Sequence, residues 1–265
     1  AFLYTGVGSI VVGGVCCVDG EAEESEENSI AAKNRASIQG WLLDGTRYGT
    51  VVLAVAYVRA CGLGLWMNGW LATYYREGFN TNDLVLASTF AATFSIAAGL
   101  LRPFGGYISD VLARNERDIL PVFEGRYREQ WTFLSLCLVF VAMLAMTVAG
   151  LSGQVLLAVG VGFLVGMGCA FAEGAIFAQV PAMFPNSSGA VAGVVGGVGT
   201  VGGIVYPLVY AAPFLPNLHV GYSIVALSMV PILLVTAWVF QPTVAARATS
   251  DGLLTRDETV SMADD

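Results

Sequence analysis

QVLLAVGVGFLVGMGCAFAEGAIFAQVPAMF, residues 154–184, is the longest apolar stretch of the sequence, and its one charged residue is Glu173. A helix needs about 20 predominantly apolar residues to cross the hydrocarbon core of a bilayer, so this stretch predicts a membrane-spanning helix. Six further stretches meet the same condition, at about 1–18, 49–75, 84–108, 131–150, 188–212 and 220–241. The sequence therefore predicts a membrane protein with several spans.

The composition supports this class. Hydrophobic residues make up 56% of the chain and charged residues 12%, about half the charged share of a typical soluble domain. This excludes an ordinary water-soluble enzyme and a disordered chain, which needs low hydrophobicity. The apolar runs are continuous and do not alternate, so an outer-membrane barrel is excluded as well. An all-α membrane protein is the class that remains.

Several kinds of partner and chemistry are not expected. The five cysteines lie in apolar stretches without a CxxC motif, and there is a single histidine, His219. These residues predict neither a metal site nor a disulfide framework, and we expect no cofactor and no enzyme activity. No basic stripe is present, so no nucleic-acid partner is expected.

The loop charges predict the orientation. The loops on one side hold nine Lys and Arg residues, whereas those on the other side hold only Arg76. By the positive-inside rule the first set is cytoplasmic, and it comprises 19–48, 109–130, 185–187 and the tail from 242. We therefore expect a protein of the plasma membrane or a bacterial inner membrane, with a cytoplasmic C-terminus.

The predicted organisation has four parts. Residues 1–18 begin without Met or basic residues, which is typical of the end of a span and not of a signal peptide. Residues 19–48 form a polar cytoplasmic loop, which suits a linker between two halves of a transporter or a solvated linker without a binding role. Residues 49–241 form a six-helix bundle, and 242–265 form a cytoplasmic tail.

Three charged residues lie inside spans, where charges are costly and usually functional: Arg59, Arg102 and Glu173. Arg102 is part of GLLRPFGGYISD, residues 99–110, and its planar guanidinium matches a planar oxyanion. The alternative is an arginine that extends to the cytoplasmic headgroups.

Glu173 and Arg59 each allow more than one role. Glu173 shares a helix face with Phe177, four residues on, and could carry a proton, pair structurally with Arg59, or face lipid headgroups or water. Arg59 follows Tyr57 by two residues, so the two side chains point to different faces. If Tyr57 faces a central cavity, Arg59 has a structural role.

Residues 189–203 are dense in glycine. They contain a formal GxGxxG at 197–202, but no strand precedes it and no acid follows until Asp251, so a dinucleotide site is rejected. Two GxxxG spacings, 193–197 and 199–203, instead let a neighbouring helix approach closely. The run serves either plain helix packing or a surface that slides past a partner helix or lines a substrate path.

Four features together resemble the nitrate/nitrite porter family of the major facilitator superfamily. They are the motifs RPFGGYISD at 102–110 and EGAIFAQVP at 173–181, the glycine run followed by Tyr206-Pro207, and Tyr57. The resemblance covers the whole chain, as the end of helix six, the central loop and helices seven to twelve. It implies the six-helix C-terminal half of a 12-helix transporter, whose N-terminal half would be a partner.

The resemblance also implies roles for individual residues. Arg102 would be one of two arginines that clamp nitrate, with the second in the N-terminal half. Tyr57 would donate a hydrogen bond and Phe177 would stack on the planar anion. The close helix contact and the freedom to rock would come from Gly199, Gly202 and Gly203.

Two departures from the family pattern stand out. Val111 follows Asp110 where the family usually has a basic residue. The nearest base is Arg114, which could pair with Asp110 through i, i+4 spacing and form the cytoplasmic gate. Many relatives have Asn where this chain has Glu173, and a carboxyl group there suits proton coupling.

The expected function is therefore alternating-access transport of nitrate across the lipid bilayer, with nitrite as a further candidate substrate and protons as the coupling ion. A nitrate/nitrite exchanger and a facilitator for another small anion or an organic acid are the main alternatives. A nitrate sensor that does not transport is a distant one.

Overall fold

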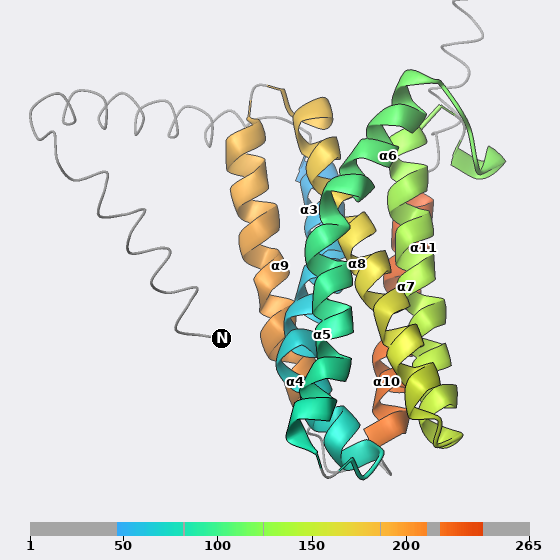
Figure 1. Cartoon of the computed structure of the whole chain (residues 1–265). Coiled ribbons are helices and arrows are strands. Elements are labelled where there is room, and N and C mark those ends of the chain that lie inside the picture. The colour runs from blue at the N-terminus through green and yellow to red at the C-terminus, as the bar shows by residue number, and fades with distance from the viewer. Residues whose placement is uncertain (1–46, 82, 124, 186, 211–217, 241–265) are drawn as a thin grey trace, which may run out of the picture. The chain divides into compact units, whose positions relative to one another are not determined.

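The computed structural model describes residues 47–210 and 218–240, apart from Asn82, Glu124 and Asn186. Every regular element in this part of the chain is helical (Figure 1). In chain order the elements are α3 (Arg47–Tyr57), η1 (Val58–Gly62), α4 (Leu63–Gly78), α5 (Leu84–Leu100), α6 (Arg102–Arg114), η2 (Pro121–Phe123), α7 (Tyr127–Leu151), α8 (Val155–Met183), α9 (Ser188–Tyr210), α10 (Leu218–Leu227) and α11 (Val230–Phe240).

These elements form six helices long and apolar enough to cross a membrane. They cover Gly49–Gly78, Leu84–Arg114, Tyr127–Leu151, Val155–Met183, Ser188–Leu208 and Leu218–Val239. Six predicted spans are thus confirmed, with ends that differ by a few residues. The predicted span at 1–18, most of the loop at 19–48 and the tail at 242–265 lie outside the described residues.

Three of the six spans are interrupted. Residues 58–62 form a π-helical turn, η1, between α3 and α4. The second span is divided at Leu101, just before Pro103, whose ring removes a backbone donor. The sixth is divided at Ser228 and Met229, between α10 and α11, and Pro231 removes a donor there in the same way. At membrane depth, backbone N–H and C=O groups without a helical partner must form hydrogen bonds with other parts of the protein.

The core lies between α4, α7, α8 and α10, which carry most of the large buried side chains. Tyr74 and Tyr75 of α4 are fully buried and pack against Tyr222 of α10 and Phe90 of α5. The second span contributes much less, since 17% of its most apolar window is buried inside the bundle. The α5 side of the bundle is therefore an open face.

Glycines bring α6 and α8 into backbone contact. A methyl group on Gly105 would lie 2.6 Å from the Phe171 Cα atom, and one on Gly106 would lie 3.4 Å from the Gly174 carbonyl oxygen. Gly174 likewise abuts the Arg102 carbonyl and the Gly106 nitrogen. Only residues without a side chain allow this approach, and it places the start of α6 beside the middle of α8.

Candidate functional site

Arg102 lies at the junction of α5 and α6 and points into the bundle. Its Nη2 donates a hydrogen bond of 2.9 Å to the Tyr57 hydroxyl, and its Nη1 lies 3.2 Å from the Glu173 Oε2 atom. The guanidinium therefore engages the protein's own groups instead of extending to the headgroups. A guanidinium has five N–H donors, so these two contacts leave donors for a further oxyanion.

Glu173 is the counter-charge of Arg102. The close contact of α6 and α8 brings the two side chains together, and the Glu173 carboxylate lies beside Gly64 of α4. A pair of opposite charges is the usual way in which a membrane span tolerates ionised groups. The sequence had left open a pair between Glu173 and Arg59; that pairing is wrong, because Arg59 points away, to Ser228.

Tyr57 and Phe177 complete the surroundings of Arg102. The Phe177 ring lies with its centroid 5.4 Å from the guanidinium carbon and meets the Tyr57 ring edge to face at 5.1 Å. The Tyr57 hydroxyl accepts from Arg102. Sequence analysis had assigned these residues to one site, and the structure brings their side chains together.

The exposure of the ion pair is uneven. The Arg102 side chain is 44% exposed and the Glu173 side chain 13%, while Tyr57 is buried. The Glu173 side chain is therefore largely covered, whereas the Arg102 side chain stays partly accessible. This arrangement can receive a small planar anion with charge-assisted hydrogen bonds and can exchange that anion for the internal carboxylate.

The glycines of α9 pack on the span that carries Tyr57. A methyl group on Gly199 would overlap the Tyr57 ring, and one on Gly202 would lie 2.6 Å from the Val58 carbonyl oxygen. Gly203 packs against Leu65. Gly199 thus reaches the site through Tyr57, while Gly202 and Gly203 contact η1 and α4.

The two GxxxG spacings behave differently. The second spacing, 199–203, makes the close helix contact that the sequence predicts. The first, 193–197, does not: a methyl group on Gly193 or Gly197 would meet nothing within 4 Å among the described residues. Among the described residues, the predicted close packing is therefore seen for the second spacing and not for the first.

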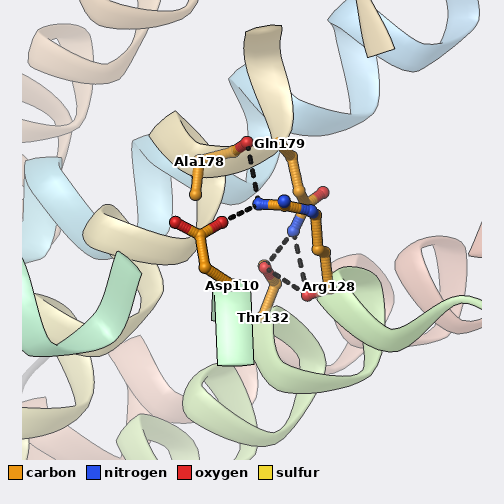
Figure 2. A network of polar contacts seen from close by, with 5 residues as sticks. All are labelled: Asp110, Arg128, Thr132, Ala178 and Gln179. Carbon is orange, nitrogen blue, oxygen red and sulfur yellow. Dashed lines mark hydrogen bonds and ion pairs between the residues drawn. The ribbon is translucent and has the colours of Figure 1, made fainter. Parts of the chain in front are cut away.

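A second polar cluster joins α6, α7 and α8 (Figure 2). Asp110 of α6 forms an ion pair with Arg128 of α7. Arg128 also donates to the Ala178 carbonyl of α8 at 3.2 Å. The expected partner of Asp110 was Arg114; the structure instead pairs Asp110 with Arg128, because α7 packs beside α6 while Arg114 is exposed at the end of its helix.

The buried Gln179 extends this cluster. Its Nε2 donates to the Thr132 hydroxyl and to the Arg128 carbonyl at 3.1 Å. Ala178 and Gln179 directly follow Phe177, so the cluster holds the turn of α8 that carries the aromatic side chain of the site. Sequence analysis missed Arg128, Thr132 and Gln179, because each reads as an ordinary residue near the end of a span.

In a comparison with protein families, residues 1–207 match the family described as Major Facilitator Superfamily. This match covers most of the 265 residues, and the chain belongs to the major facilitator superfamily. It is an integral membrane protein of a transporter family, which supports the expectation that it is not an enzyme.

Curated relatives are similar at about 30% identity. The probable nitrate/nitrite antiporter NarK1 of Thermus thermophilus is 31% identical over 58% of this chain and 35% of its own length. The high affinity nitrate transporter 2.7 of Arabidopsis thaliana is 32% identical over 69% of this chain and 35% of its own length. Elsinochrome transporter 1 of Elsinoe fawcettii is 28% identical over 72% of this chain and 35% of its own length.

The chain thus spans about a third of the length of these relatives. Two of the three carry nitrate in their names, and so does the high-affinity nitrate transporter 2.3 of Oryza sativa subsp. japonica, at 28% identity over 62% of this chain and 30% of its own length. These relatives support the resemblance to the nitrate/nitrite porters within the superfamily.

Proposed function

We propose that the chain is the C-terminal half of a transporter that moves nitrate by alternating access, with nitrite as a further candidate substrate. The observation that carries this proposal is the half-exposed Arg102 guanidinium, held by Tyr57 and Glu173 beside the Phe177 ring. Nitrate is planar and delocalised, so a guanidinium can bind it through two parallel hydrogen bonds. An N-terminal half would close the open side of the site and supply a second arginine.

The proposed energy source is proton co-transport through Glu173. The Glu173 carboxylate neutralises Arg102, so nitrate and an ionised Glu173 compete for the same guanidinium. Protonation of Glu173 removes the competitor, which makes proton binding and nitrate binding mutually favourable. Import of one anion against an inside-negative potential costs about 2.3 kcal/mol per 100 mV, and two protons per nitrate would reverse the sign.

Labelled nitrate uptake into liposomes that contain the full-length transporter tests both parts of the proposal. One arm applies an inward proton gradient, and the other loads nitrite inside without a gradient. Accumulation driven by the proton gradient alone is the expected result. The absence of nitrate flux in both arms would reject nitrate as the substrate and favour another small anion or an organic acid.

Nitrate/nitrite exchange is the second candidate, since one relative is named a probable nitrate/nitrite antiporter. The substitution Glu173→Gln separates the two. We expect the Gln variant to lose proton-driven accumulation and to retain exchange, because the amide cannot carry the proton and no longer competes as an anion. If both activities survive in the variant, Glu173 has no part in coupling.

A further inference from the structure

Arg59 is a charge inside a membrane span that the proposed transport cycle does not use. It lies in the span Gly49–Gly78, where an unpaired cation is costly. In the described part of the chain, the ion pairs are Arg102 with Glu173 and Arg128 with Asp110. Neither pair includes Arg59. Arg59 instead donates to the Ser228 hydroxyl at 2.8 Å and to the Ser228 carbonyl at 2.6 Å.

Ser228 lies where the sixth span is interrupted. α10 ends at Leu227 and α11 begins at Val230. Carbonyls of the last turn of α10 accept from Ser228 and Met229, whereas the Ser228 carbonyl lies past that helix and accepts from Arg59. The C-terminal end of a helix also carries partial negative charge. The Arg59 guanidinium supplies both a donor and a positive charge at this point, which explains how a cation without a carboxylate is retained at membrane depth.

The same turn of backbone carries Tyr57. η1 begins directly after Tyr57, and Tyr57 faces Arg102 while Arg59 faces Ser228. Arg59 also lies over the ring of Tyr206, with the guanidinium carbon 5.5 Å from the centroid. One irregular turn therefore presents a site tyrosine on one side and an anchoring arginine on the other.

A π-helical turn is a rare backbone conformation and occurs frequently at functional sites. Gly62 of η1 and Gly202 of α9 meet backbone to backbone, with a methyl group on Gly62 lying 2.5 Å from the Gly202 Cα atom. The hydrogen bonds of Arg59 add a directional contact, because they join η1 to a second interrupted helix.

We infer that Arg59 is a positioning residue for the substrate site: by anchoring η1 to the break at Ser228, it holds the Tyr57 hydroxyl against Arg102. This inference rests on the proposed function. It assigns Arg59 no contact with the anion. It states that the loss of the anchor weakens anion binding through Tyr57 and through no other group.

A double-mutant cycle on the full-length transporter tests this inference. The variants are Arg59→Gln, Tyr57→Phe and the two combined, and the readouts are the KM and maximal rate of nitrate uptake per transporter in the membrane. We expect each single variant to raise KM by about tenfold, the loss of roughly one charge-assisted hydrogen bond, with a smaller change in maximal rate. The double variant is expected to match Tyr57→Phe alone, because no hydroxyl remains to be positioned.

The inference is overturned if the KM of the double variant rises by the product of the two single-variant increases. It is also overturned if the KM of either single variant is unchanged. If Arg59→Gln does not reach the membrane, Ser228→Ala replaces it, since this change removes one of the two hydrogen bonds and is expected to raise KM about threefold. Ser223→Ala is the matched control, a serine of α10 that bonds Thr147 at 2.8 Å and should leave KM unchanged. Unaltered nitrate binding in an Arg102→Lys variant would instead reject the proposed function itself.

Discussion

Arg102 is suited to a planar anion by the shape of its head group as well as by its charge. Its guanidinium is held by Tyr57 and Glu173, and these contacts set its orientation. Preorganisation of this kind lowers the entropy that binding costs. The buried Tyr57 and the largely covered Glu173 hold the Arg102 side chain, which remains partly exposed.

We expect Arg102→Lys to weaken nitrate binding by at least about tenfold although the charge is kept, because an ammonium cannot form two parallel hydrogen bonds. The measurement is the nitrate affinity of the full-length transporter, with Arg76→Lys as the control. Arg76 is exposed at the far end of α4, so its replacement should change nothing. Nitrate affinity of the Lys variant equal to that of the unmodified protein would contradict the assignment.

At the scale of the elements, the site depends on helices that touch backbone to backbone. Gly105, Gly106 and Gly174 join α6 to α8, and Gly199 and Gly202 join α9 to α3 and η1. These contacts place functional side chains from different helices within hydrogen-bonding distance.

We expect Gly199→Ala to destabilise the protein by about 1–3 kcal/mol, because the new methyl group overlaps the Tyr57 ring. Gly160→Ala is the matched control. Gly160 is an exposed helical glycine, and a methyl group added to it would meet nothing within 4 Å, so the change should be neutral or stabilising by up to about 1 kcal/mol. Thermal unfolding of the purified protein in detergent compares the two, and shifts of the same sign would contradict the packing argument.

The cluster of Asp110, Arg128 and Gln179 holds three helices together at one end of the bundle (Figure 2). We expect Asp110→Asn to cost about 1 kcal/mol of stability, a modest value because the aspartate is partly exposed. Arg128→Gln should cost roughly 2 kcal/mol, since the Ala178 carbonyl also loses its donor. Arg114→Gln serves as the control in the same unfolding assay; a loss for Arg114→Gln as large as that for Arg128→Gln would refute the pairing.

At the scale of the whole molecule, the spans place successive loops at opposite ends of the bundle. The α4–α5 and α7–α8 connections lie at one end, and the α6–α7 connection lies at the other (Figure 1). Basic residues are concentrated in the predicted loops on the side of the α6–α7 connection, which predicts that this end is cytoplasmic. The Asp110–Arg128 cluster would then lie on the cytoplasmic side of Arg102.

Cysteine labelling tests this orientation. In intact cells, a membrane-impermeant maleimide should label Glu77→Cys at the end of α4, whereas Arg117→Cys in the α6–α7 loop should react only after permeabilisation. Both residues are exposed. The unmodified chain is the control, because its own cysteines lie in apolar stretches. The reverse pattern would invert the orientation and place the cluster on the outside.

The sequence was sufficient for several levels of this description. The six described spans and their approximate limits follow from runs of apolar residues, since crossing a bilayer requires a minimum length. Arg102 and Glu173 were conspicuous because charges are rare inside spans. The glycine run was recognisable by composition alone, although the sequence could not distinguish the spacing that packs, 199–203, from the one that meets nothing among the described residues, 193–197.

The choice of partners was decided only by the tertiary structure. Glu173 pairs with Arg102 and not with Arg59, and Asp110 pairs with Arg128 and not with Arg114. The rotation and contact of neighbouring helices bring these groups together across long stretches of sequence. The anchoring of Arg59 at Ser228 depends on two helix breaks that meet in space. Transfer into the bilayer acts on each segment by itself, whereas pairing depends on how the segments pack, so the sequence determined the spans and the structure determined the site.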